Sequence, residues 1–514
     1  MEEKEKRQHR RGIEIKSRLI LIAFFILLQI GVILSVAYFF ASKRAWVYAL
    51  LETISIIIAV SIVSKKGNPS YKIMWVAYIL IFPVVGGLVY LFWGGGRVFP
   101  HIKRQMIKFA RGADRFIKQD KDIKSRLIYD DMLHARQASF LTNSCGLPVY
   151  DGTETKFLAP GEKAFPVILE ELKKAKKYIF IEFFILAEDS MFEEILEVLK
   201  DRIKNGVEVR LIFDDFGSIT RQYRHFVRRL DALGIQVEVF NKIKPSANIF
   251  MNNRNHRKII VIDGEVAFTG GMNIADEYIN RKTLHGYWMD CAIMLKGKAV
   301  TSFVVMFLAM WGYCTKKYQR YNRYVAKNEV KTNGFVLPYS DGPINEKNPA
   351  EGIYMQLLNT AQKYVYIVTP YLIVDHTMIR ELTLAASSGI DVRIITPKIP
   401  DKNYVHPVTQ YCYGELLEAG VRIFEYTPGF VHSKIFVSDD STATVGTVNM
   451  DYRSFFFHFE CGVWLCKTDS IAEIKQHFLS LQSESEEIFY EKWKNRPIET
   501  KIKQTILHLF APFM

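Results

Sequence analysis

The middle of the chain reads His256-Arg257-Lys258-Ile259-Ile260-Val261-Ile262-Asp263 and then, after a gap of six residues, Gly270-Gly271-Met272-Asn273. The pattern returns as His432-Ser433-Lys434-Ile435-Phe436-Val437-Ser438-Asp439, followed after six residues by Gly446-Thr447-Val448-Asn449. A single His-x-Lys is a weak signal, but this pattern fixes four polar residue types and a glycine. Its recurrence at identical spacing indicates that the chain contains a duplicated unit.

The sequence around each copy repeats as well, because apolar runs and helical segments come in the same order before both histidines. The matched segments are the runs 178–186 and 364–372, the helical segments 191–205 and 378–388, and the strands 206–212 and 389–395. Near-continuous apolar strands that alternate with helices are typical of sheets covered on both faces. We therefore expect an α/β fold with two duplicated halves, 141–335 and 336–514, each an α/β sandwich, that share one active site.

The N-terminal part has a different composition. Residues 1–18 form a basic tail, and a predicted membrane module, 19–96, follows with apolar runs at 19–42, 45–64 and 73–96. Runs of this length predict transmembrane helices and a multi-pass protein of the cell membrane, the bacterial cytoplasmic membrane. Residues 97–140 are again basic and predict a helical connector beside the membrane. Because both flanks are basic, the sequence leaves open whether two or three runs span, and which side of the membrane holds the site.

The overall composition limits the partners of the protein. The chain has 514 residues, 49% of them hydrophobic, and a formal net charge of +14, which fits a polyanionic partner. The positive charge is concentrated beside the apolar runs, so we expect anionic phospholipid rather than nucleic acid. The six cysteines show no metal-binding spacing, and neither a metal nor a cofactor is expected.

The repeated motif places acid-base groups beside cations. Residues i and i+2 of a strand point to the same face, so each histidine shares a face with its lysine. If the halves pack about a pseudo-twofold axis, six side chains converge on one anionic centre: His256, Lys258, Asn273, His432, Lys434 and Asn449. A phosphodiester suits that centre. One imidazole can attack phosphorus while the other protonates the leaving oxygen, and the roles then reverse.

Four carboxylates complete the candidate site. Asp263 and Asp439 belong to the motif, but the turn-forming residues after them indicate a role in anchoring the active strand. Asp290 and Glu460 lie on the next strand-like run of their halves and could fix a histidine tautomer.

Two further features have alternative interpretations. Arg453 and Ser454 either contact a headgroup or close a turn. The tail 488–514 mixes aromatic, basic and aliphatic residues, so it either lies on a membrane surface or packs as an ordinary C-terminal helix.

With these residues in place, the pattern resembles the paired HKD motifs of the phospholipase D superfamily. Residues 268–278, 287–290 and 446–454, with the N-terminal apolar module, are similar to bacterial cardiolipin synthases. The resemblance implies a ping-pong exchange without a cofactor. One phosphatidylglycerol gives its phosphatidyl group to an enzyme histidine and releases glycerol, and a second accepts that group to give cardiolipin. It implies that His256 is the nucleophile and His432 the acid and then the base, although the sequence allows the reverse.

Three alternatives remain at this point. The nearest is another phospholipase D-type phosphatidyltransferase or a lipid hydrolase, because the residues that select the acceptor cannot be identified from the sequence. A membrane-tethered nuclease is a second alternative, since nucleic acid also offers phosphodiesters. A non-catalytic membrane scaffold is the third, but no histidine or lysine of either motif is missing.

Overall fold

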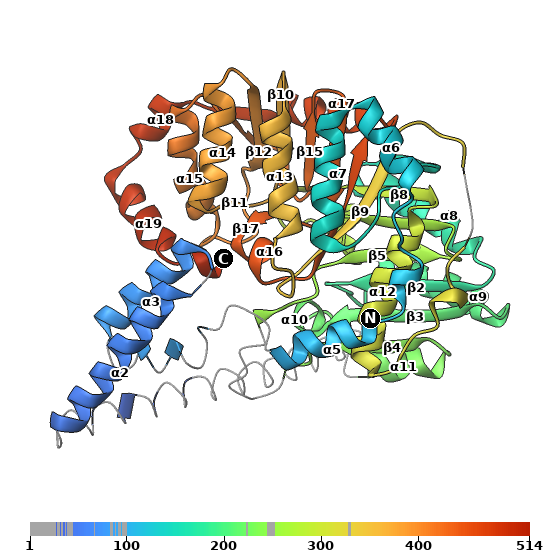
Figure 1. Cartoon of the computed structure of the whole chain (residues 1–514), viewed down its shortest axis with the longest axis horizontal. Helices are drawn as coiled ribbons and strands as arrows, with labels where there is room; N and C mark the ends of the chain where they lie inside the picture. The colour runs from blue at the N-terminus through green and yellow to red at the C-terminus, as the bar shows by residue number, and fades with distance from the viewer. Residues whose placement is uncertain are drawn as a thin grey trace, which may run out of the picture. The chain divides into compact units, whose positions relative to one another are not determined.

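The computed structural model describes residues 45–65, 67–82, 86–87, 89–90, 94, 100–222, 225–243, 252–326 and 330–514, with a few isolated positions before residue 45. The chain divides into two compact units. One consists of Phe99–Phe240, Asn253–Pro512 and Met514, and it contains both copies of the repeated motif (Figure 1). The other consists of Met1–Val98, Asn241–Asn252 and Phe513.

The first half of the larger unit is built on a seven-stranded sheet with the order β1-β8-β6-β5-β2-β3-β4. Its elements are β1 (Thr153–Leu158), α8 (Gly161–Lys173), β2 (Tyr178–Phe183), α9 (Ser190–Lys204), β3 (Glu208–Asp214), α10 (Asp215–Ser218), α11 (Phe226–Ala232), β4 (Gln236–Phe240), β5 (Lys258–Ile262), β6 (Val266–Gly270), β7 (Tyr287–Met289), β8 (Ala292–Gly297) and α12 (Val300–Thr315).

The second half is built on an eight-stranded sheet with the order β19-β13-β12-β10-β15-β16-β18-β9. Its elements are β9 (Phe335–Asp341), α13 (Pro349–Thr360), β10 (Tyr364–Val368), β11 (Leu372–Ile373), α14 (His376–Ser387), β12 (Asp391–Pro397), α15 (His406–Glu418), β13 (Arg422–Tyr426), β14 (Gly429–Val431), β15 (Ile435–Ser438), β16 (Thr442–Gly446), β17 (Met450–Asp451), α16 (Tyr452–Phe456), β18 (Glu460–Cys466), α17 (Ser470–Ser483), β19 (Ser485–Ile488), α18 (Tyr490–Lys494) and α19 (Ile498–His508).

The two sheets follow one plan. In each, three strands run parallel (β2, β3 and β4, or β10, β12 and β13). The strand that continues from the His-x-Lys motif, β5 or β15, lies antiparallel beside the first of them. The remaining strands continue the sheet in the same order, and β19 is an additional edge strand of the second half. The prediction of two duplicated α/β halves is therefore confirmed.

The alternation of side chains along β2 and β10 explains how helices cover both faces. Ile179 and Ile181 point into the core under α8 and α9, whereas Phe180 stacks on Phe307 of α12, with ring centroids 4.4 Å apart and the rings nearly parallel. In β10, Val365 and Ile367 face the core under α13 and α14, and Tyr366 stacks on Phe478 of α17. Successive residues of a strand point to opposite faces, so each central strand is buried from both sides.

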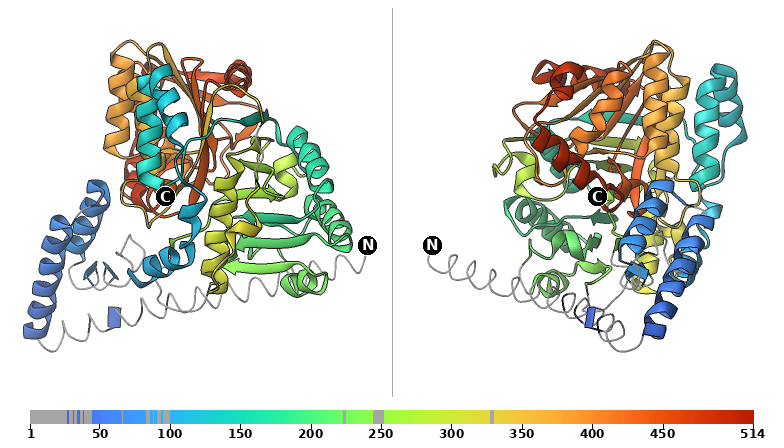
Figure 2. Two further views of the ribbon diagram at one scale, coloured as in Figure 1. Left: turned by 45° about the vertical axis from the view of Figure 1, so that its right-hand side comes forward. Right: turned by 90° about the vertical axis from the view of Figure 1, so that its left-hand side faces the viewer.

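Helices of the predicted connector pack on the larger unit. They are α5 (Pro100–Ala110), α6 (Lys121–Asp130) and α7 (Met132–Cys145). Helix α7 lies beside α13 of the second half, as both views of Figure 2 show, and its Ala135, Ala138 and Leu141 join that half's core. Asp131 caps its N-terminus by accepting the backbone N–H groups of Leu133 and His134.

The predicted N-terminal transmembrane helices need correction, and the multi-pass topology is not confirmed. Helix α2 (Ala45–Ser64) packs on α3 (Pro69–Ile81) through Ala59, Ile62, Trp75 and Ile79. A bilayer-crossing helix, long and apolar enough to span, is not found in the described part of the chain. The run 73–96 does not continue as one helix, because α3 ends at Ile81 and Pro83 disfavours helical backbone in the residue before it. Thirteen residues give a helix of only about 20 Å. Most of the run 19–42 lies outside the described residues.

Candidate active site

The two halves meet through the segments that carry the repeated motif. The backbone N–H of His256 donates to the carbonyl of Phe459, at 2.9 Å, and that of His432 donates to the carbonyl of Met289, at 2.7 Å. Strands β14 and β7, which precede His432 and Asp290, pair in parallel across the halves. Each histidine is thus fixed to the backbone of the opposite half.

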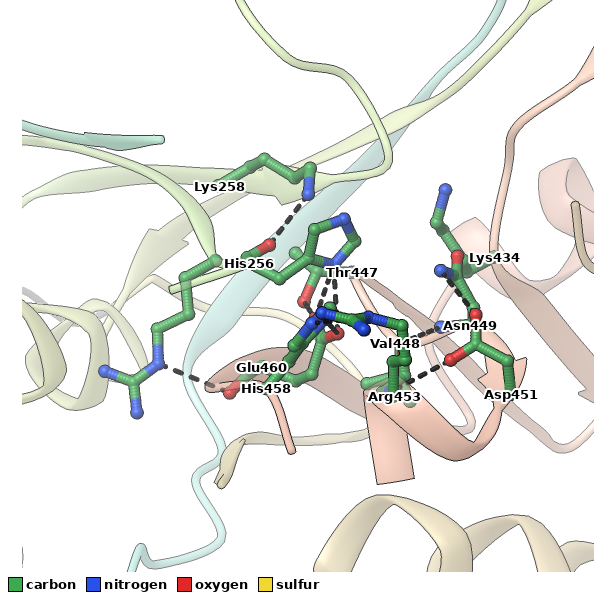
Figure 3. A network of polar contacts seen from close by, with 12 residues as sticks. His256, Lys258, Lys434, Thr447, Val448, Asn449, Asp451, Arg453, His458 and Glu460 are labelled. Atoms are coloured by element: carbon green, nitrogen blue, oxygen red, sulfur yellow. Dashed lines mark hydrogen bonds and ion pairs between the residues drawn. The ribbon is translucent and has the colours of Figure 1, made fainter. Parts of the chain in front are cut away.

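The orienting carboxylates cross between the halves in the same way. The Nδ1 atom of His256 lies 2.9 and 3.0 Å from the two carboxylate oxygens of Glu460 (Figure 3). Nδ1 of His432 lies 2.7 Å from Oδ2 of Asp290. Both carboxylates are fully buried, and both histidines are less than a tenth exposed. A carboxylate at Nδ1 accepts a hydrogen bond from the ring N–H and keeps the proton on that nitrogen, which leaves Nε2 of each ring available for chemistry.

The two lysines lie with the histidines. Nζ of Lys258 donates to the backbone carbonyl of His256 at 2.7 Å, and Nζ of Lys434 donates to that of His432. Burial lowers the pKa of Lys258 to about 7 and that of Lys434 to about 8. Both lysines, and His432, also depress the pKa of His256 electrostatically. The structure therefore brings the two histidines and two lysines into one site.

Burial also controls the charge of the imidazoles. It lowers the pKa of His256 well below the ordinary value, and Lys258 lowers it further. It lowers the pKa of His432 to about 4, and Lys434 contributes to that shift. Burial raises the pKa of Glu460, and the nearby Lys258 ammonium opposes that rise. Both imidazoles are consequently neutral at neutral pH while the site holds no anion.

The two asparagines are buried and held by different partners. Oδ1 of Asn273 accepts the backbone N–H of Ile185 at 3.0 Å, and its Nδ2 donates to the hydroxyl of Tyr278 at 2.7 Å. Nδ2 of Asn449 donates to Asp451 at 3.1 Å, and its Oδ1 has no hydrogen-bond partner among the described residues. An unpaired buried acceptor is costly, and Asn449 can therefore accept a hydroxyl from a bound molecule.

The motif aspartates do not join the histidines. They stand at the other end of the motif strands, where each carboxylate accepts three consecutive backbone N–H groups at 2.7 to 2.9 Å. Asp263 holds the residues that begin β2, and Asp439 those that begin β10. Both have a left-handed backbone, with φ of 54° and 53°, as a tight turn after a strand requires.

His458 is a neighbour of the site that sequence reasoning did not identify. Its ring centroid lies 5.6 Å from that of His256, and its Nδ1 lies 3.9 Å from Glu460. Nε of Arg453 donates to its Nε2 at 3.2 Å (Figure 3). Arg453, for which contact with a headgroup was one expectation, thus lies beside the site. His458 stands two residues before Glu460, as Trp288 stands two before Asp290. Because residues i and i+2 of an extended segment point to the same side, this spacing could have identified His458 as a neighbour of the site.

One pair of matched positions differs between the halves. Thr447 donates its hydroxyl to Glu460, whereas the corresponding residue of the first half is Gly271. A Cβ atom on Gly271 would lie 2.1 Å from Oδ1 of Asp290 and 2.8 Å from the backbone oxygen of His432. The first half therefore requires glycine here because its orienting carboxylate lies closer to the backbone.

His256, His458 and Glu460 form a group whose donor atoms lie within 4.8 Å of one another. The group fits a metal ion poorly, because Glu460 already accepts from His256 and Nε2 of His458 accepts from Arg453. Lys258 and Arg453 also place positive charge against it. The surroundings favour an anion at this site.

Comparison with known proteins supports these observations. A family model described as "Cardiolipin synthase, PLD-like domain" matches residues 168–311 and 354–482, and one described as "Phospholipase_D-nuclease N-terminal" matches residues 53–95. A cardiolipin synthase of Geobacillus sp. (strain WCH70) is 33% identical over 93% of this chain and 97% of its own length. Cardiolipin synthase 2 of Bacillus anthracis is 34% identical over 88% of each chain.

An uncharacterised protein of Streptococcus mutans is 39% identical over 86% of this chain and 96% of its own length. Among solved structures, the phosphatidylserine synthase of Haemophilus influenzae Rd KW20 matches with a TM-score of 0.55 and 15% identity, over 74% of this chain and 97% of that one. The structural likeness supports the fold, and the sequence relationships identify the family. The chain belongs to the cardiolipin synthase family of phospholipase D-like enzymes.

Proposed function

We propose that this protein transfers the phosphatidyl group of one phosphatidylglycerol to a second one, giving cardiolipin and glycerol. The observation that carries the proposal is the pair of neutral imidazoles, each oriented through Nδ1 by a carboxylate of the other half and each beside a buried lysine. That arrangement supports two successive displacements at one phosphorus. Relatives named cardiolipin synthase support the choice of substrates.

In the first step, Nε2 of His256 attacks the phosphorus of the donor lipid. An N–P bond forms as the P–O bond to the terminal glycerol breaks, and the imidazolium of His432 gives its Nε2 proton to the leaving oxygen. Glu460 accepts the Nδ1–H of His256 and stabilises the positive charge that develops on that ring. Lys258 and Lys434 balance the charge of the phosphoryl oxygens.

In the second step, Nε2 of His432 removes the proton from the terminal hydroxyl of the second phosphatidylglycerol. That oxygen attacks phosphorus, and the P–N bond to His256 breaks. Cardiolipin leaves, and both histidines return to their starting forms. The exchange breaks one phosphodiester bond as it makes another, so these residues complete it without an external energy source.

The assignment of roles has support from the pKa values. Burial and Lys258 lower the pKa of His256 and hold its ring unprotonated, as suits a nucleophile that needs its lone pair. His432 must be cationic to act as the acid. A phosphodiester brings a negative charge close to its ring and raises its pKa, so substrate binding should draw a proton into the site.

The site of action that we propose is a membrane surface, because both substrates are lipids. Transfer rather than hydrolysis requires that water be kept from the phosphohistidine. Both histidines are more than nine-tenths buried, which supports such exclusion. Anionic phospholipids other than phosphatidylglycerol can enter the same cationic site.

The test is to supply the purified protein with vesicles of phosphatidylglycerol alone and to follow lipid products and free glycerol. We expect cardiolipin and glycerol in equal amounts. Phosphatidic acid as the main product would show a hydrolase instead. His256→Ala and His432→Ala should each abolish turnover, and only His256→Ala should also prevent trapping of a lipid-linked enzyme.

A further inference from the structure

Helix α19 carries an apolar stripe that faces away from the rest of the larger unit. Its members are Ile498, Ile502 and Ile506 of the helix and Leu509 directly after it, and their exposed fractions are 67%, 53%, 53% and 64%. Intervals of four, four and three residues place them on one face of a helix. Figure 1 shows α19 beside α15 near the C-terminus. No residue in the described ranges covers this stripe, which we call the α19 stripe.

The opposite face of α19 packs mainly through polar groups. Gln504 is buried, accepts from Nε of Arg496 at 2.6 Å and donates to Gln410 of α15 at 3.4 Å. The ring of His508 stacks on Tyr411 of α15, with centroids 4.1 Å apart. A helix that only completes a globular core turns its apolar side inward. Because the apolar side of α19 faces outward instead, it is available to contact a hydrophobic environment outside the protein.

The charges near the α19 stripe suit an anionic lipid surface. Helix α19 carries Lys501 and Lys503 against Glu499, and the neighbouring α18 carries Lys492 and Lys494 against Glu491, so each helix has a basic excess. Helices that lie in a membrane interface combine an apolar face with basic residues, because the former enters the acyl boundary and the latter contact headgroups. A second copy of the chain would bring a like-charged surface to the same place.

The C-terminal segment links α19 to the active site. After α19 the chain packs Ala511 into a small core with Tyr452 and Val408. The backbone carbonyl of Met514 then accepts the N–H of Arg453 at 3.1 Å, and Arg453 itself donates to His458. The C-terminal segment therefore attaches α19 to α16, whose Arg453 contacts His458 beside the site.

We propose that the α19 stripe inserts into the headgroup layer of a membrane rich in anionic phospholipid and holds the active site against the surface that supplies its lipids. This inference rests on the proposed function for the identity of the lipid. It identifies an anchoring surface on the catalytic unit itself. Lipid would thus reach the site from the layer in which α19 lies.

The experiment measures insertion without relying on activity. The full chain with Ile502→Cys is labelled with a polarity-sensitive fluorophore and reconstituted with phosphatidylglycerol vesicles, with or without a spin label on the lipid chain near the headgroup. Gln476→Cys, at an exposed position of α17, is the matched control, and the unsubstituted protein corrects for labelling of natural thiols. We expect a blue shift and quenching by the lipid spin label at position 502, and neither at position 476.

A label at 502 that is neither shifted nor quenched would overturn the proposal. A label that is shifted but not quenched would also overturn it, because protein would then cover the stripe, either a second copy or the apolar run 19–42.

As a second test, Ile502→Gln with Ile506→Gln should lower the rate on vesicles about tenfold and spare the rate on short-chain lipid in detergent. If neither protein makes cardiolipin, the proposed function fails while the fluorescence result stands.

Discussion

Replacing Asp290 with asparagine should stop the second half of the reaction more completely than the first. In the native site both oxygens of Asp290 are used. Oδ2 lies 2.7 Å from Nδ1 of His432, and Oδ1 accepts the backbone N–H of Cys291 at 2.8 Å. An asparagine has only one oxygen for these two donors. The orientation of its amide therefore decides which proton His432 carries.

The energies favour one orientation. If the amide oxygen stays on His432, the amide NH2 group faces the N–H of Cys291, and leaving that buried donor unpaired costs about 1–3 kcal/mol. If the amide turns, its NH2 group donates to Nδ1 of His432, and the neutral ring moves its proton to Nε2 at small cost. His432 then has no lone pair with which to act as a base. We expect kcat to fall by about 10³- to 10⁴-fold.

The assay separates the two steps. The Asp290→Asn enzyme is mixed with labelled phosphatidylglycerol and stopped at intervals, and cardiolipin, free glycerol and the label retained on denatured protein are measured. A slow release of glycerol without cardiolipin, and label retained on protein, is the expected result, because the neutral ring still presents an Nε2 proton to the leaving oxygen but is a weaker acid than the imidazolium. His256→Ala is the control and should retain no label. Turnover within tenfold of the wild-type rate would refute the tautomer argument, and lost turnover without retained label would mean that His432 is the nucleophile.

Three further variants test other parts of the site. The wild-type kcat/KM should fall above about pH 7, because the Lys258 ammonium loses its proton there. In Lys258→Arg the fall should move to about pH 8, where Lys434 loses its proton. An unchanged pH profile would mean that Lys258 does not bind the phosphate. Gly271→Ala should displace Asp290 and lower kcat about 10²-fold without a large change in melting temperature, and a normal rate would contradict the predicted clash. Asp263→Ala should reduce the free energy of unfolding by about 2–4 kcal/mol in denaturant titrations, because three backbone N–H groups, one of them buried, lose their acceptor. Unchanged stability would argue against an anchoring role.

The sequence was most informative where a pattern recurs at the same spacing. The repetition of the His-x-Lys pattern at the same spacing predicts a second half with the same strand order. Both sheets have that order, and the predicted family is confirmed. The apolar run 178–186 likewise predicts a strand, which the structure has at Tyr178–Phe183. The prediction that each histidine and its lysine share a strand face was wrong, because β5 begins at Lys258 and β15 at Ile435, so both histidines precede their strands.

Hydropathy was a weaker guide in the N-terminal part. A long apolar run gives the total length of a hydrophobic segment, but it does not show where one helix ends. In the run 73–96 the helix stops at Ile81, two residues before Pro83, because the pyrrolidine ring conflicts with helical backbone in the preceding residue. The prediction of N-terminal transmembrane helices was wrong because it weighed composition more heavily than this break.

The pairing of histidines with carboxylates across the halves could not be read from the sequence. Spacing suggested that Asp290 and Glu460 could orient a histidine, and each stands closer in sequence to the histidine of its own half. The backbone bonds from His256 to Phe459 and from His432 to Met289 place each carboxylate against the other half's histidine instead. A single half would therefore hold a histidine without its orienting carboxylate and a buried carboxylate without its proton donor. Because an unpaired buried charge is costly, each half needs the other for stability as well as for chemistry, which gives a physical reason for the motif to occur twice in one chain.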